Sequence, residues 1–275
     1  MSESKAFTIH VNGVEIDARQ GETILQAAAR ANIEIPTLCH DARLEPVGSC
    51  RMCLVEVGGQ RRLQPSCTWK ATPGQVIQTE TERINRHRQL LLSLYLADKV
   101  EPASDEHQPP LRKDNDVERF AARYGTPLIL DKVEAPREGR ADHNPYVHFD
   151  PNRCILCERC VRYCDEVEGV NAITLSGRGP HTTISTPNKL SLLDTSCELC
   201  GGCIDTCPTG AMTEKKPYSV HLTPEAEASA KEVRTTCNFC GVGCQLDLHV
   251  ANNEIIKVTS PSPGETVNDG NLCVK

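Results

Sequence analysis

The chain has 275 residues, of which 39% are hydrophobic and only 4% aromatic, and it contains 16 cysteines. The length suggests about two domains, but the apolar residues are few, so we expect small modules that bound metal helps to stabilise. The formal net charge of −7 argues against nucleic-acid binding.

The first residues, MSESKAFTIH, contain no apolar segment of a signal peptide and no twin arginine. The longest apolar run, LLLSLYLA (90–97), is too short to span a bilayer. We therefore expect a cytoplasmic protein without membrane insertion. In such a protein, clustered cysteines indicate metal or redox sites rather than disulfides.

The N-terminal segment predicts a hairpin, a helix and a cysteine loop. FTIHVNGVEIDA alternates around Asn12-Gly13, which favours a tight turn, and GETILQAAARANIEIP predicts an amphipathic helix that ends before Pro36. A C-x10-C-x2-C-x13-C pattern follows, formed by Cys39, Cys50, Cys53 and Cys67.

This order of elements is that of a β-grasp ferredoxin. The segments IPTLCH, GSCRMCLVEV and PSC resemble the 2Fe-2S domain of the large iron-sulfur subunit of complex I. The resemblance implies one 2Fe-2S cluster on these four cysteines. The alternative, a zinc site, lacks the second close cysteine pair of a zinc ribbon.

Residues 80–97 predict a helix with a charged face. We expect this face to be solvated, with docking of an acidic partner as the alternative. Its charged residues are Arg83, Arg86, His87 and Arg88.

Residues 98–145 are rich in proline and charge and predict a linker. Complex I relatives often carry a cluster here that is bound by one histidine and three cysteines, but no cysteine lies between Cys67 and Cys154. We therefore expect no cluster in this segment, and we interpret His87, His107 and His143 as surface residues.

The next two groups share the spacing C-x2-C-x2-C-x3-C, which is the bacterial two-cluster ferredoxin pattern. In this pattern the fourth cysteine of each run binds the cluster of the other run. One predicted 4Fe-4S site comprises Cys154, Cys157, Cys160 and Cys207. The other comprises Cys164, Cys197, Cys200 and Cys203. Structural zinc is the alternative for both.

Two short segments in this region have simpler interpretations. SGRGP (176–180) predicts a turn in the insert between the two runs, because no phosphate-loop pattern accompanies it. LTPEAEASAKE (222–232) predicts a short connecting helix before the last module.

The fourth group has a different spacing, C-x2-C-x3-C-x28-C, and comprises Cys237, Cys240, Cys244 and Cys273. With CGVGC and DGNLCVK, it resembles the 4Fe-4S module of the molybdenum or tungsten bis-pterin oxidoreductases, formate dehydrogenases above all. In that family the lysine two places after the last cysteine helps electrons pass to the pterin, which implies this role for Lys275. A small zinc site is the alternative.

One 2Fe-2S and three 4Fe-4S clusters would use all 16 cysteines. We therefore predict a modular α+β protein: a β-grasp 2Fe-2S domain (1–80), a helix and linker (81–145), a paired 4Fe-4S ferredoxin (146–216) and a 4Fe-4S module of the pterin-enzyme type (230–275). No cysteine remains as a nucleophile, so we predict no catalytic residue.

The order of modules is similar to the iron-sulfur region of cytosolic NAD-linked formate dehydrogenases. This resemblance implies an electron relay between a Mo/W-pterin subunit or domain outside this sequence and a flavin/NAD diaphorase-type subunit or a ferredoxin. It leaves open whether the chain is a separate subunit or a piece of a longer one, and it implies no complete active site here.

Two other functions stay open. The chain could be a non-catalytic electron hub of a hydrogenase or a flavin-based transhydrogenase, whose relatives share the first three cysteine groups. It could also be a zinc scaffold without redox activity. The spacing from Cys237 to Cys273 favours the pterin-enzyme interpretation over the hub.

Overall fold

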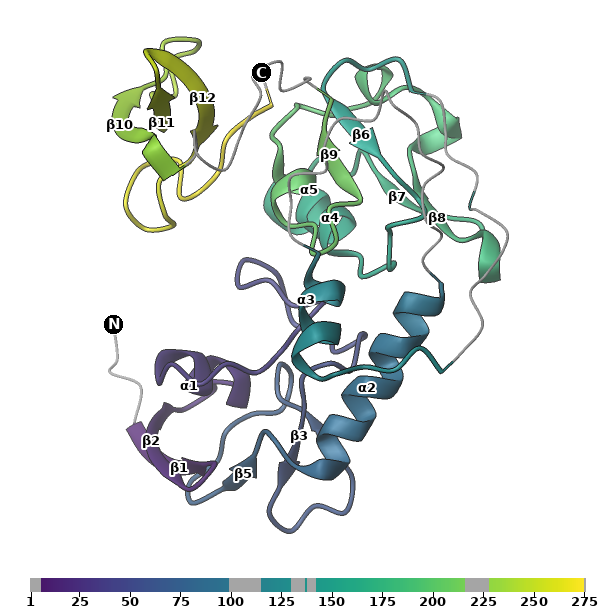
Figure 1. Cartoon of the computed structure of the whole chain (residues 1–275), viewed down its shortest axis with the longest axis vertical. Coiled ribbons are helices and arrows are strands. Elements are labelled where there is room, and N and C mark those ends of the chain that lie inside the picture. The colour runs from purple at the N-terminus through teal and green to yellow at the C-terminus, as the bar shows by residue number, and fades with distance from the viewer. Residues whose placement is uncertain (1–5, 99–114, 130–136, 138–141, 216–227, 275) are drawn as a thin grey trace.

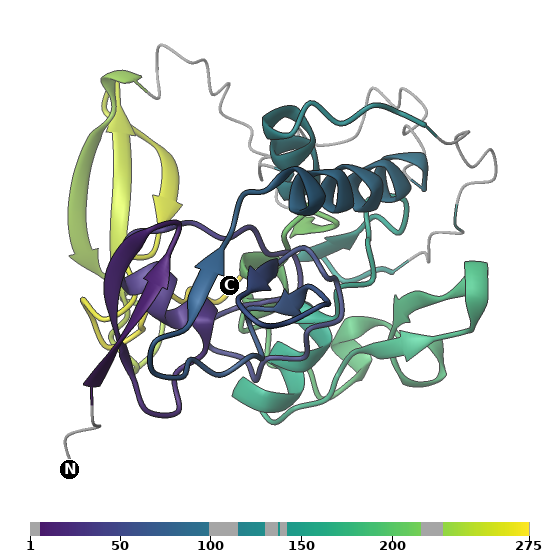
Figure 2. The same cartoon turned by 90° about the horizontal axis from the view of Figure 1, so that it is seen from below.

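The computed structural model describes residues 6–98, 115–129, 137, 142–215 and 228–274. Three bodies follow one another along the chain (Figure 1): a sheet with helices, a region of short helices and small hairpins, and a three-stranded sheet. In both views the three-stranded sheet stands apart from the helices α2 and α3 (Figure 1, Figure 2). The predicted class of modular α+β protein is confirmed.

The first module begins with the expected hairpin. Strands β1 (Ala6–Val11) and β2 (Val14–Arg19) pair antiparallel. The turn residues Asn12 and Gly13 have φ values of 52° and 80°, as a tight hairpin turn requires. Alternate side chains of both strands, such as Ile9 and Ala18, are fully buried, so one face of the hairpin forms the core.

Helix α1 (Ile24–Arg30) packs into that core and is shorter than the sequence suggested. It starts at Thr23, which forms a capping box with Gln26. It ends well before Pro36, because Asn32 adopts a left-handed backbone with a φ of 58°.

Three further strands complete a five-stranded sheet: β3 (Leu54–Val57), β4 (Gln64–Pro65) and β5 (Val76–Gln78). The strand order is β2-β1-β5-β3-β4, in which β1 and β5 run parallel and the other pairs antiparallel. This mixed sheet with a helix packed on its core is the architecture expected for a β-grasp ferredoxin.

Helix α2 (Glu82–Ala97) matches the helix predicted over 80–97. Its predicted solvated face is wrong at one position, because the Arg88 side chain is 0% exposed. Arg83 and Arg86 are exposed, as expected, and His87 is only partly exposed.

Helix α3 (Asp116–Arg123) lies within the segment predicted to be a linker and was not foreseen. Asn115 caps its first turn by accepting a hydrogen bond from the amide of Val117. It packs on α2, and Val117 and Phe120 share a core with Leu92 and with residues of the first cysteine loop. Packing against this loop accounts for a helix too short to be stable alone.

The second module is built from short elements around its own core. It contains β6 (Val147–Phe149), α4 (Arg159–Arg162), a π-helical turn (Tyr163–Val167), α5 (Gly202–Asp205) and β9 (Met212–Glu214). Strands β6 and β9 pair antiparallel and bring the two ends of the module together.

The insert between the cysteine runs contains β7 (Thr174–Ser176) and β8 (Thr183–Ser185), which form a hairpin, and single 3-10 turns at Gly179–His181, Pro187–Lys189 and Leu192–Asp194. The predicted turn at 176–180 is confirmed.

The last module is the antiparallel sheet β10 (Lys231–Thr236), β11 (Gln245–Ala251) and β12 (Glu254–Thr259). All six residues of β10 are exposed. The connecting helix predicted over 222–232 falls mostly outside the described residues, and its last two positions belong to β10 instead. None of the helices in the described ranges has the length and apolar character needed to cross a bilayer.

Candidate metal centres

The first candidate site is a buried loop that brings four thiols together, those of Cys39, Cys50, Cys53 and Cys67, each 7% exposed or less. The Sγ atoms of Cys53 and Cys67 lie 3.3 Å apart, and the amide of Cys50 donates a hydrogen bond to Sγ of Cys39 over 3.4 Å. Hydrogen bonding by Cys50 lowers the pKa of Cys39 to about 4, and hydrogen bonding by Cys67 lowers that of Cys53 to about 7. Because thiolates are the metal-binding form, this donor set fits a 2Fe-2S cluster.

The two ferredoxin-type runs have the same local backbone. Leu156 and Leu199, which occupy equivalent positions, have φ values of 55° and 62°, which are rare for leucine. Their amides each donate to the sulfur two residues earlier, Cys154 and Cys197 respectively, over 3.4 Å. Hydrogen bonds of this kind to sulfur are one of the levers that set cluster potentials.

The fourth cysteine of each run lies near the other run. Burial raises the pKa of Cys154 to about 11 and that of Cys157 to about 12, and the charge of Cys207 adds to both shifts. Burial also raises the pKa of Cys197, and the charge of Cys164 adds to it. The structure thus brings each fourth cysteine close to the three cysteines with which the ferredoxin pattern groups it.

The pair Gly201-Gly202 allows two close contacts that the motif alone did not reveal. A Cβ on Gly202 would lie 2.0 Å from the ring of Tyr163, the residue before Cys164. A Cβ on Gly201, whose φ is 85°, would lie 2.4 Å from the carbonyl oxygen of Leu272. Glycine is therefore required at both positions.

The fourth site, in the last module, is more open. Cys237 follows β10 and Cys244 precedes β11, and the amide of Cys237 donates to the carbonyl of Cys244 over 2.8 Å. Cys240 and Cys273 are exposed. Burial and then the charges of Cys240, Cys273 and Cys237 raise the pKa of Cys244, so all four thiols share one neighbourhood.

Asn268 organises the loop that delivers Cys273 and was missed in the sequence. Its amide nitrogen donates to the carbonyl of Asn271 and to the hydroxyl of Ser260, both over 2.9 Å. Its amide oxygen accepts from the amide of Gln245 over 2.9 Å. Lys275, predicted to relay electrons, lies outside the described residues.

Contacts between the modules follow the order of the sites. Cys157 packs against the core that contains Cys39 and Cys50. Arg162 of the second module donates to the carbonyls of Cys39 and Glu45 in the first.

At the other end of the second module, the amide of Val274, next to Cys273, donates to the carbonyl of Leu199 over 3.0 Å. Leu199 lies between Cys197 and Cys200. The last module is therefore joined to the second ferredoxin-type run, through the contact that Gly201 permits.

Arg43 joins the three modules at one point. Its guanidinium pairs with Asp41 and Asp205 over 2.8 Å each and donates to the side-chain oxygen of Asn271 over 3.0 Å. Asp41, Asp205 and Asn271 lie two residues from Cys39, Cys207 and Cys273 respectively. The guanidinium also lies 4.9 Å from the ring centre of Tyr163. One cation thus links segments next to all four groups of cysteines.

Histidines do not add a further site in the described part of the chain. No three histidine, cysteine, aspartate or glutamate side chains there converge around a single metal ion. His143 is 75% exposed, as predicted, whereas His87 is half-buried and its Nε2 has no hydrogen-bond partner there. His107 lies outside the described residues.

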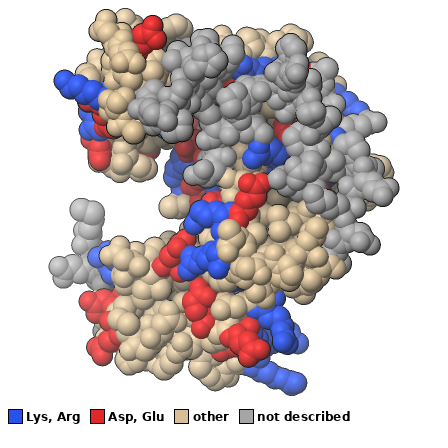
Figure 3. All heavy atoms as spheres, in the orientation of Figure 1, with Lys and Arg blue, Asp and Glu red and all other residues tan. Residues whose placement is uncertain are grey.

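The charged surface on the face seen in Figure 3 is mixed in sign where α3 meets the first module. There Arg119 and Arg123 both pair with Glu34, over 3.3 Å and 2.7 Å. Acidic and basic side chains therefore alternate at this junction.

Three family models match successive parts of the chain. The "2Fe-2S iron-sulfur cluster binding domain" matches residues 4–82, the ferredoxin-like domain of "NADH-quinone oxidoreductase subunit 3" matches residues 144–213, and the "Molybdopterin oxidoreductase Fe4S4 domain" matches residues 230–275.

Known proteins are similar over almost the whole chain. The chain is 37% identical to an NADH-quinone oxidoreductase subunit of Rhizobium meliloti and 35% identical to "NADPH-Fe(3+) oxidoreductase subunit alpha" of Geobacter sulfurreducens, over 98% and 97% of its length. It spans only 30% of each relative.

A solved structure of an NAD+-reducing [NiFe]-hydrogenase, in its H2-reduced state, also resembles the chain, with a TM-score of 0.64 and 30% identity. The match covers 79% of this chain and 90% of the hydrogenase chain. The chain thus belongs to the 2Fe-2S and 4Fe-4S electron-transfer regions of the NADH-quinone oxidoreductase 75 kDa type, within the molybdopterin oxidoreductase family.

Proposed function

We propose that the chain is the iron-sulfur relay of a formate dehydrogenase-type complex. In this role it passes single electrons between a Mo/W-pterin formate site outside this sequence and a flavin/NAD subunit or a ferredoxin. The match of residues 230–275 to a molybdopterin oxidoreductase module supports a pterin-metal neighbour.

The proposed clusters use the cysteine sets predicted from spacing. The 2Fe-2S cluster is assigned to Cys39, Cys50, Cys53 and Cys67. The first 4Fe-4S cluster is assigned to Cys154, Cys157, Cys160 and Cys207, and the second to Cys164, Cys197, Cys200 and Cys203. The third 4Fe-4S cluster is assigned to Cys237, Cys240, Cys244 and Cys273. We also propose four domains with the bounds predicted from the sequence, with α3 added to the segment 81–145.

One observation carries the proposal: the four sites are joined in a single series of contacts. The 2Fe-2S loop contacts Cys157, the two ferredoxin-type runs meet where Gly202 packs on Tyr163, and the second run pairs with Val274 beside Cys273. We infer the order 2Fe-2S, first 4Fe-4S, second 4Fe-4S and last 4Fe-4S, with the pterin-metal partner at the last site.

The residues of this chain hold the clusters and set their surroundings. The bound clusters would supply one-electron redox chemistry, and cluster type, hydrogen bonds to sulfur and burial tune their potentials. The amides of Leu156 and Leu199 stabilise thiolate charge at the two ferredoxin-type runs. Arg43 keeps the segments beside the sites in register, as its contacts with Asp41, Asp205 and Asn271 indicate.

The second candidate is an electron hub in an NAD(P)-linked oxidoreductase or hydrogenase complex. The similarity to an NAD+-reducing hydrogenase favours it, because the match covers 90% of that chain. Both candidates need the same relay, and they differ in the partner at one end.

The test is to purify the chain without oxygen from its native source, with its bound partners, and to measure metals and cluster reduction. Iron near the roughly 14 atoms of one two-iron and three four-iron clusters, together with Mo or W and bleaching of the clusters by formate, would support the formate relay. The same iron with reduction by H2 or NAD(P)H but not by formate would favour the hub. Zinc in place of iron would contradict both.

A further inference from the structure

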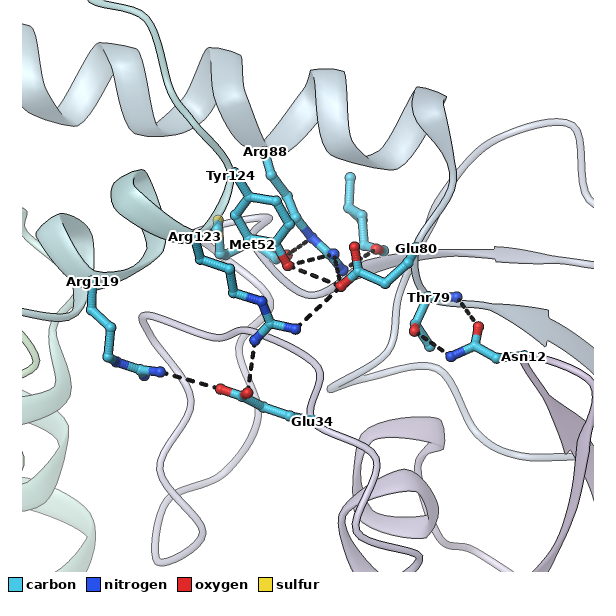
Figure 4. A network of polar contacts seen from close by, with 10 residues as sticks. Asn12, Glu34, Met52, Thr79, Glu80, Arg88, Arg119, Arg123 and Tyr124 are labelled. Carbon is cyan, nitrogen blue, oxygen red and sulfur yellow. Dashed lines mark hydrogen bonds and ion pairs between the residues drawn. The ribbon is translucent and has the colours of Figure 1, made fainter.

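Arg88 on α2 is a buried cation in the first module. Its side chain is 0% exposed, whereas Arg86 on the same helix is 83% exposed. Arginine is almost never fully buried unless it is paired, so the surroundings of Arg88 indicate what its burial achieves. In Figure 4 the side chain runs from α2 toward the segment that contains Met52.

Two of the groups that bind Arg88 belong to the first cysteine loop. Its Nε donates to the carbonyl of Met52 over 3.3 Å, and its Nη2 donates to the carbonyl of Leu54 over 3.4 Å. Met52 lies between Cys50 and Cys53, and Leu54 follows Cys53 directly. The positive charge is therefore held against the backbone that carries two of the four thiols.

The counter-charge lies on the other side of the guanidinium. Nη1 donates to Glu80 and to the hydroxyl of Tyr124, both over 2.9 Å, and that hydroxyl donates to Glu80 over 3.0 Å. The Glu80 side chain is 37% exposed. Water therefore screens the carboxylate more than it screens the buried cation.

The rest of the network has the same arrangement. Arg123 also approaches Glu80, over 3.5 Å, and pairs with Glu34, which is 56% exposed (Figure 4). The acidic members thus lie near the surface, while the cation closest to the cysteine loop has no solvent contact. The network presents its positive end to the candidate cluster.

A buried ion pair is by itself weak evidence for a role in stability, because apolar residues often stabilise such a position as well or better. The contacts with Met52 and Leu54 add a feature that stability does not require: they place a fixed positive charge beside a site that gains negative charge when it is reduced. In a region of low dielectric, a nearby opposite charge favours the more negative state.

We propose that Arg88 sets the reduction potential of the 2Fe-2S cluster, raising it by holding a buried positive charge against the loop of Cys50 and Cys53. Glu80 moderates this effect as the partly exposed counter-charge. The inference rests on the proposed assignment of a 2Fe-2S cluster to the first cysteine group.

The test is an anaerobic redox titration of the full chain with its clusters, followed by EPR at a temperature where the 2Fe-2S signal is resolved from the faster-relaxing 4Fe-4S signals. Arg88→Gln should lower the midpoint potential and Glu80→Gln should raise it. Buried neighbouring charges change ionisation equilibria by about tenfold or more, so we expect about a tenfold change in the reduction equilibrium, or about 59 mV for a one-electron couple.

Matched controls lie on the same helix. Arg86 and Glu82 form an exposed pair at 3.8 Å, with side chains 83% and 93% exposed. Arg86→Gln and Glu82→Gln remove the same charges from α2 without touching the cysteine loop. Both should leave the potential unchanged.

Opposite shifts for Arg88→Gln and Glu80→Gln would support the proposal, because loss of structure alone would not give opposite signs. Unchanged potentials, or shifts of the same sign, would overturn it. If Arg88→Gln fails to assemble the cluster, Glu80→Gln decides alone, and an unchanged potential there overturns the proposal. Iron content and spin count report separately on the 2Fe-2S assignment, so its failure is distinguishable.

Discussion

The first and last modules solve the same problem, holding four thiols in place, by different means. In the first module all four cysteines are at most 7% exposed and a large apolar core surrounds them. In the last module Cys240 and Cys273 are exposed, β10 is exposed along its length, and Phe239 beside Cys240 is 70% exposed. Burial stabilises the first site, whereas metal binding and partner contacts must contribute more at the last one.

This contrast fits the two ends of a relay. A buried site protects its cluster from solvent, and its potential is open to adjustment by a buried charge such as Arg88. An open site next to exposed apolar residues suits contact with the domain or subunit that exchanges electrons with it.

Removal of iron should have the largest effect and should separate the two modules. We expect the β10–β12 sheet to lose its amide protection, because it buries few side chains, while β1 and β2 keep theirs. Hydrogen exchange before and after chelation of iron measures this. Equal loss of protection in both sheets would contradict the comparison.

Matched substitutions of one residue type should show the same contrast in stability. Ile9 is 0% exposed in the first module, and Ile255 is 54% exposed in the last. We expect Ile9→Ala to lower the free energy of unfolding by about 2 to 5 kcal/mol and Ile255→Ala to change it by less than about 0.5 kcal/mol. Urea unfolding of each variant measures both values, and similar losses would show that both modules depend on packing alike.

Gly202→Ala should disturb the contact between the two ferredoxin-type runs, because the new methyl group would overlap the Tyr163 ring. We expect a loss of about 1 to 3 kcal/mol and reduced 4Fe-4S content in thermal unfolding and iron analysis. Gly241→Ala is the control, since nothing lies within 4 Å of its Cβ position. A stable Gly202→Ala variant with full iron would contradict this close contact.

The smallest effect is expected at the junction of the modules. Burial raises the pKa of Asp41, but hydrogen bonds from Arg43 and Thr206 outweigh burial and hold that pKa well below its usual range. Because the folded pKa lies below the unfolded one, the stabilisation is fully present above about pH 4 and is lost as the pH falls further. Asp41→Asn should therefore lower stability by about 1 to 2 kcal/mol.

Urea unfolding of the wild type and Asp41→Asn between pH 8 and pH 5 checks the sign, because the difference should stay constant over this range. A difference that shrinks steadily from pH 8 would mean that another group carries the effect.

Much of this organisation is readable from local patterns in the sequence. Spacing sorts the cysteines into four groups, and Asn12-Gly13 marks the first hairpin, because both depend on residues close together in the chain. Helix α3 was missed because its eight residues are stabilised by packing on α2 and the cysteine loop. Arg88 was misassigned because its burial depends on the carbonyls of Met52 and Leu54, more than thirty residues away.

The contacts that join the modules were also beyond the sequence. Arg43 and the glycines Gly201 and Gly202 act on partners far along the chain, and no local pattern names those partners. The glycine pair between Cys200 and Cys203 was the one available signal, because side chains are rarely absent twice in succession without a close approach.

The most direct test of the proposed relay is the spin relaxation of the reduced 2Fe-2S cluster, measured by EPR in variants that lack one neighbour. We predict that Cys157→Ser, which removes a ligand of the proposed first 4Fe-4S cluster, slows this relaxation, because the adjacent reduced cluster is lost. Cys240→Ser should leave it unchanged, because the last cluster lies at the far end of the series. Slower relaxation only in Cys240→Ser would contradict the inferred order.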